Sequence, residues 1–93
     1  MITELYVLNG SAEAIKTAIQ KAEKSKDDRI RKVYEEKGME DKVIYHVAGA
    51  TVVFNYIYYN MKKSTKLRIT AQTSDDSFRA RSVLESITGV KIE

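Results

Sequence analysis

A long uncharged stretch constrains the fold more than any other feature of this sequence. The nineteen residues between Lys42 and Lys62 include no Asp, Glu, Lys or Arg, which approaches the length of about 20 residues needed for a transmembrane helix. However, His46, Asn55 and Asn60 interrupt the stretch, and its β-branched and aromatic residues favour strands. We therefore expect strands of a globular domain here, and no association with a membrane.

Alternation of side chains defines three strands in this half of the chain. The sequence predicts strands at 43–48 and 51–60, joined by a turn at 48–50, and a third at 66–72 after a polar turn at 61–65. In the middle strand, alternation places apolar residues on both faces, so at least one face must be buried in the core. The second face then belongs to the core, to a subunit interface or to a binding surface.

Two segments show the spacing of amphipathic helices. A strand at 2–8 precedes the first, which runs from Ser11 to about residue 24, and the second runs from Ser74 to a stop at Gly89. A short edge strand is expected at 90–92. The residues that form the two apolar stripes are Ala12, Ile15, Ile19 and Ala22, and then Ala80, Val83, Leu84 and Ile87.

The densely charged segment 25–42 admits two interpretations. Ile30, Val33 and Tyr34 would share one face of a short second helix that ends at Gly38. Alternatively, the segment is a mobile charged loop. Both alternatives remain open at the level of sequence.

These elements predict a single domain spanning residues 1–93. Their order, β-α-(α)-β-β-β-α-β, indicates an α+β fold, a mostly antiparallel sheet of four to five strands with two or three helices on one face. A chain of this size buries only about two thirds of its unfolded surface. We therefore expect a homodimer or larger assembly, with the aromatic strand as its interface through Phe54, Tyr56 and Tyr58.

Several kinds of chemistry find no support in the sequence. The chain has no cysteine and a single histidine, His46, so we expect no metal site and no redox chemistry. Its four glycines are isolated, and its adjacent carboxylates point in different directions in a helix or strand. We therefore expect no cofactor, no catalytic residue and no enzymatic activity. We also expect a cytoplasmic location, because Glu4 lies where a signal peptide is basic and apolar, and the absence of proline favours a thermophilic source.

Charge is distributed unevenly, within a net charge of +3. No acidic residue occurs from Val43 to Ser74, a range that also holds five of the aromatic side chains. Cations attract phosphates and aromatic rings stack on unpaired bases, so RNA or DNA is the first expected ligand. The candidate contacts are Lys62, Lys63, Lys66 and Arg68, extended by Arg79 and Arg81. The alternatives are a scaffolding subunit that contacts another protein without nucleic acid and, third, a small hydrolase or transferase.

A partial family resemblance supports the first two of these functions. The segment Lys66-Leu-Arg-Ile-Thr-Ala-Gln-Thr-Ser-Asp-Asp-Ser-Phe-Arg-Ala80 resembles the small dimerising subunit of the KEOPS tRNA-modification complex. The strand and helix at 2–23 are similar in pattern. The insert at 25–42, the extra strand and the tail after Gly89 depart from that family. The resemblance implies a non-catalytic homodimer that scaffolds an enzyme and touches tRNA.

Overall fold

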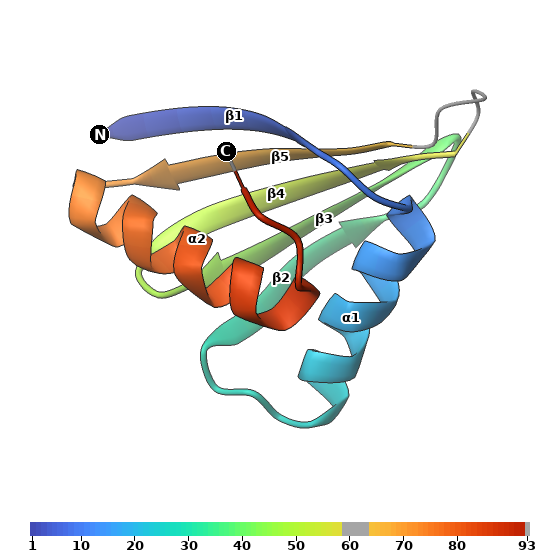
Figure 1. The fold of residues 1–93 in the computed structure, drawn as a ribbon, viewed down its shortest axis with the longest axis horizontal. Coiled ribbons are helices and arrows are strands. Elements are labelled where there is room, and N and C mark those ends of the chain that lie inside the picture. Colours follow the sequence, from blue (N-terminus) through green and yellow to red (C-terminus); the bar gives the residue numbers. More distant parts are fainter. Residues whose placement is uncertain (59–63, 93) are drawn as a thin grey trace.

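The computed structural model describes residues 1–58 and 64–92. It shows a five-stranded antiparallel sheet with two helices on one face (Figure 1). This architecture confirms the α+β class. The strands lie in the order β1-β5-β4-β3-β2 across the sheet. In chain order the elements are β1 (Ile2–Leu8), α1 (Ala12–Lys24), β2 (Ile30–Glu36), β3 (Glu40–Val47), β4 (Ala50–Ile57), β5 (Ser64–Ala71) and α2 (Ser74–Thr88).

Four of the strands form a meander, and the first strand joins it from the far end of the sequence. Strands β2 to β5 pair consecutively, whereas β1 pairs with β5 along its whole length. The tight turn between β3 and β4 falls at the predicted position, with Ala48 at φ 48° and Gly49 at φ 84°, as two-residue hairpin turns require. The sheet therefore has two edges, β1 and β2.

The ends of both helices follow from local hydrogen bonds. The Ser11 hydroxyl accepts a hydrogen bond from the Ala14 N–H, which confirms the predicted start of α1. Helix α2 is capped by Thr73, one residue before its expected start, and ends at Gly89 with φ 71°. None of the helices in the described ranges is long or apolar enough to cross a membrane.

The core lies between the sheet and the two helices. Its centre is an aromatic cluster on β3 and β4, in which the Phe54 ring stacks on Tyr56 at 5.7 Å and meets Tyr45 edge to face at 6.0 Å. Ile15 and Ile19 of α1 are buried over the same face. The helices cover one side of the sheet, and no helix or strand of the described residues lies on the other side (Figure 1).

Segment 25–42 was predicted as a helix or a loop, and both predictions are wrong, because it contains the edge strand β2. The register between β2 and β3 shifts between Lys32 and Tyr34. This bulge inserts one extra residue into the alternation, which hides the period of two that marks a strand. Ile30 and Tyr34, which would share one face of a helix, lie on opposite faces of the sheet. The true element order is therefore β-α-β-β-β-β-α.

The prediction of an edge strand at 90–92 is also wrong, because no strand follows α2 in the described residues. The backbone N–H of Ile92 instead donates a hydrogen bond to the Glu85 side chain at 2.7 Å. Ile92 is buried, so the tail is held to the end of α2 by this bond and by apolar packing. Of the predicted strand at 51–60, residues 59 and 60 lie outside the described residues.

Candidate functional site

The face of the sheet opposite the helices, hereafter the open face, exposes apolar side chains that a solvated sheet does not need. On β1, Leu5 is 75% exposed and Val7 is 64% exposed. Directly opposed residues in neighbouring strands share a face, so the register defines two rows across the open face. From β1 to β2, these rows are Leu5, Arg68, Val53, Ile44 and Tyr34, and then Val7, Lys66, Asn55, Lys42 and Glu36.

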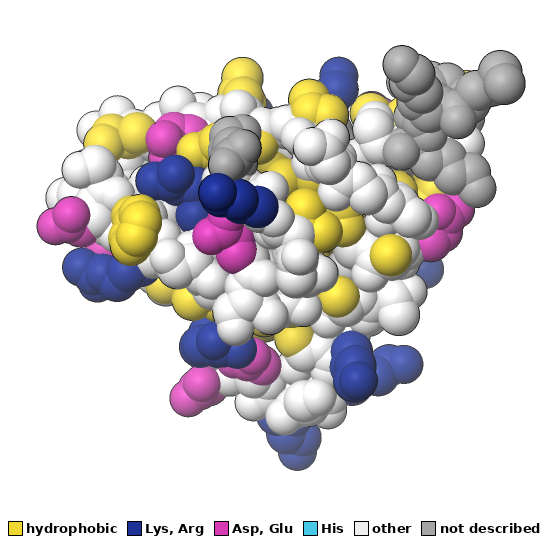
Figure 2. Space-filling model, viewed as in Figure 1, with side chains coloured by type: hydrophobic (Ala, Val, Ile, Leu, Met, Phe, Trp, Pro, Cys, Tyr) yellow, Lys and Arg dark blue, Asp and Glu magenta, His cyan; other side chains and the backbone are white. Residues whose placement is uncertain are grey.

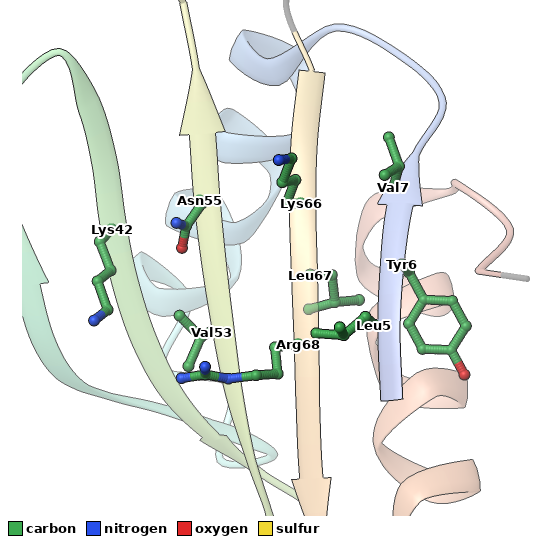
Figure 3. A pocket seen from close by; sticks show the side chains of 9 residues that line it. All are labelled: Leu5, Tyr6, Val7, Lys42, Val53, Asn55, Lys66, Leu67 and Arg68. Atoms are coloured by element: carbon green, nitrogen blue, oxygen red, sulfur yellow. The ribbon is translucent and has the colours of Figure 1, made fainter. Parts of the chain in front are cut away.

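A shallow hollow of about 420 Å³ lies where these rows cross the middle of the sheet. Figure 3 shows its side chains arising from four adjacent strands, with Arg68 extending across β4 toward Val53. Leu5 and Val7 bound it on the β1 side, and the Asn55 amide lies beside Lys66 in the register. The hollow therefore combines apolar contact area with an amide and basic side chains. The ring of Tyr6, although it contributes to the rim, points away from the hollow (Figure 3).

Three cations surround this hollow: Lys42, Lys66 and Arg68. None of the three forms an ion pair with another residue of 1–58 or 64–92. From strand geometry, the backbone positions of Lys66 and Arg68 are about 7 Å apart along β5. Lys42 lies two strands away from Lys66, at a distance of about 10 Å. Glu36 of β2 directly opposes Lys42, and Glu40 lies on the same face of β3, so the positive charge of the hollow is concentrated at Lys66 and Arg68.

The basic residues predicted from sequence do not form one patch. Lys66 and Arg68 lie on the open face, whereas Arg79 and Arg81 lie on α2, on the other side of the sheet. Arg79 lies 3.7 Å from the Asp76 carboxylate, and Arg81 lies 4.0 Å from Glu4. Arg79 and Arg81 therefore lie apart from Lys66 and Arg68. Lys62 and Lys63 lie outside the described residues.

The aromatic residues predicted as an interface face inward. Phe54 and Tyr56 are 0% and 1% exposed beneath the helices, and Tyr58 is half-buried on the same side. Their rings fill the core of their own chain, so we place neither a stacked base nor a partner chain on them. Within the described part of the chain, Tyr34 on the edge strand is the one Tyr or Phe ring on the open face.

The helix-covered side of the molecule carries charges of both signs among its described residues. Figure 2 shows basic and acidic side chains interspersed on that side, over both helices. Interspersed charges of opposite sign offset one another's attraction for a polyanion.

A polar cluster beneath α1 was not anticipated from the sequence. Asp41 is 8% exposed on the covered face, and its carboxylate accepts a hydrogen bond of 2.5 Å from the Lys16 ammonium. This bond raises the pKa of Lys16 and lowers the pKa of Asp41, so both groups stay charged. The Lys16 nitrogen also lies 5.7 Å from the centre of the Tyr58 ring. We assign this cluster a structural role, since neither charged group is poised to transfer a proton near neutral pH.

His46, the single histidine, lies exposed on the open face, where its Nδ1 is 3.1 Å from the Arg31 guanidinium. In the described ranges no three side chains of His, Asp or Glu are arranged to hold a metal ion. His46 thus takes part in a surface hydrogen bond.

Leu5, Val7, Lys42 and Asn55 belong to the site but were not among its predicted residues. The alternation in 2–8 already places Leu5 and Val7 on the face of the strand that points away from the buried Leu8 side chain. Lys42 was taken as the boundary of a strand that in fact begins at Glu40. No model of a protein family matches this chain, and neither the curated proteins nor the solved structures that were compared with it include a match.

Proposed function

We propose that this protein is a non-catalytic module that binds nucleic acid on the open face of its sheet. The observation that carries this proposal is the group of three cations, Lys42, Lys66 and Arg68, which surrounds the hollow and forms no ion pair with any of the described residues. Unpaired cations on one face attract a polyanion because phosphate contacts release condensed counterions.

The rest of the hollow favours single strands over a duplex. Leu5 and Val7 offer apolar area that the faces of unpaired bases can cover, and the Asn55 amide can donate to and accept from base edges. A duplex hides its base faces, so it would use the cations alone. We therefore expect single-stranded RNA or DNA to bind more tightly than a duplex of equal charge, with weak preference among sequences.

Replacing Lys66 and Arg68 together by alanine is expected to weaken binding and to flatten its salt dependence. Each phosphate contact to a single strand contributes about 0.7 to the slope of log affinity against log salt, so the double variant should lose up to about 1.4. Both side chains are exposed, so the fold should be retained. Fluorescence anisotropy with a labelled single-stranded RNA across a salt series measures both quantities.

The matched control is the Lys21→Ala, Lys24→Ala variant. These two exposed lysines lie in the last turn of α1, on the other side of the sheet, and their loss changes the net charge by the same amount. The control should bind like the parent. Equal slopes for the two double variants, or no binding by the parent at low salt, would refute the proposal.

A scaffolding subunit of a protein complex, like the KEOPS subunit that the sequence resembles, is the second candidate. The exposed Leu5 and Val7 favour it, because apolar side chains grouped on a surface are typical of protein contacts. Under this function the cations of the open face would contact acidic side chains of the partner. Binding of the parent to RNA with the salt dependence described above would decide against it.

A further inference from the structure

The two edges of the sheet differ in how they are protected from pairing with another chain. Edge strands expose unpaired backbone N–H and C=O groups, and proteins protect them with charged side chains and bulges. The β2 edge has both, with a bulge between Lys32 and Tyr34 and charged residues at most of its other positions. This edge is closed to a further strand.

The β1 edge has neither form of protection. Its seven residues pair with β5 without any irregularity, which leaves a straight outer edge. Its single charged side chain, Glu4, accepts a hydrogen bond from Ser77 and lies 4.0 Å from Arg81, so its charge is engaged within the chain. Leu5 and Val7 are the most exposed apolar side chains of the sheet.

We propose that β1 pairs antiparallel with β1 of a second copy, so that the two sheets become one. Two identical antiparallel strands are related by a two-fold axis, which makes the contact self-complementary. If the axis passes through Leu5, each Leu5 faces its counterpart, Thr3 faces Val7, and Glu4 faces Tyr6. This register places no two like charges opposite each other, because Glu4 is the single charged residue of β1.

A second copy fits this edge better than it fits the open face. Stacking two open faces would bring Lys42, Lys66 and Arg68 of one copy against those of the other, and like charges brought together destabilise a contact. Pairing at β1 instead keeps both open faces on the same side of the joined sheet. The two hollows then lie next to each other across Leu5 and Val7, and the cations of both copies border one surface.

Light scattering after size exclusion tests the proposal on the full chain. The parent should be a dimer at micromolar concentrations, and Leu5→Lys should raise the dimer dissociation constant by about tenfold or more, because two like charges then face each other across the axis. Leu5 is 75% exposed, so the monomer should fold, as circular dichroism can verify. Met39→Lys is the control, since Met39 is 78% exposed in the turn at the far edge. A monomeric parent at every concentration would overturn the proposal.

Cross-linking locates the contact independently of affinity. The natural chain has no cysteine, so Leu5→Cys introduces a single thiol that the proposed register places beside its counterpart, within the reach of a disulfide. Mild oxidation should convert this variant to a covalent dimer and leave Met39→Cys largely monomeric. A dimer that survives Leu5→Lys, or equal cross-linking of the two variants, would place the interface elsewhere. Both experiments are done without nucleic acid, so their results test the dimer independently of the proposed nucleic-acid binding.

Discussion

Replacing Phe54 by alanine is expected to lower the free energy of unfolding by about 3–5 kcal/mol, because the cavity remains after the ring is gone. Phe54 is completely buried, and its ring contacts those of Tyr45 and Tyr56 in the centre of the core. Small domains have about 5–15 kcal/mol of stability in total. The substitution should therefore remove a large share of the stability of the fold. Urea denaturation followed by circular dichroism would show this as a transition at a lower urea concentration.

Phe78→Ala provides the matched control for this substitution. The Phe78 ring is 62% exposed on α2, and the Arg81 guanidinium lies over it at 5.6 Å in a cation–π contact. Exposed contacts of this type contribute about 0.5–1 kcal/mol. Similar losses for the two variants would show that Phe54 is not the centre of the core.

Replacing Asp41 by alanine is expected to lower the free energy of unfolding by about 2 kcal/mol. Removing one partner of a fully buried ion pair lowers it by more, about 3–5 kcal/mol. The side chains of Asp41 and Lys16 are 11% and 21% exposed. Without the carboxylate, the Lys16 ammonium loses its partner in a partly desolvated position. Asp28→Ala is the control, because Asp28 is exposed, and its loss should change stability by less than about 0.5 kcal/mol.

The stability that Asp41 contributes should depend on pH in the acid range. Lys16 lowers the pKa of Asp41 in the folded state below its ordinary value of 3.8. A carboxyl whose pKa falls on folding stabilises the fold above its unfolded pKa, and this stabilisation disappears as the pH falls through the folded pKa. The difference between parent and Asp41→Ala should thus be constant from about pH 5 to 8 and should shrink below about pH 4. A difference that grows on acidification would contradict the assigned pairing.

The helices and the meander could be predicted from sequence because their signals are local. Ser11 and Gly89 mark helix ends through hydrogen bonds and backbone angles within a few residues. Strand β2 was missed because its bulge breaks the alternation, and because Ile30 is its single fully buried residue. An edge strand with one anchor and a bulge carries no periodic signal of either type.

The composition of the site depends on which face the helices cover, and local patterns do not determine that choice. Strand β4 presents Phe54 and Tyr56 on one face and Val53 and Ile57 on the other, so both faces are apolar. The helices cover the aromatic face, which removes the rings from the surface. The same arrangement places Arg79 and Arg81 on the far side of the sheet from Arg68, although they follow it closely in sequence.

The position of β1 at the edge beside β5 also determines when the fold can be completed during synthesis. Thr3 and Thr70, which face each other across this pair, are 67 residues apart in the chain. Strands β2 to β5 can form successive hairpins as they emerge, whereas β1 is made first and has no partner until β5 has been made. Its pairing closes the longest loop in the sheet, a step that the loss of chain entropy makes slow. Leu5 and Val7 therefore remain on an unpaired segment through most of translation, and a nascent chain that stops before residue 64 gives β1 no strand to join.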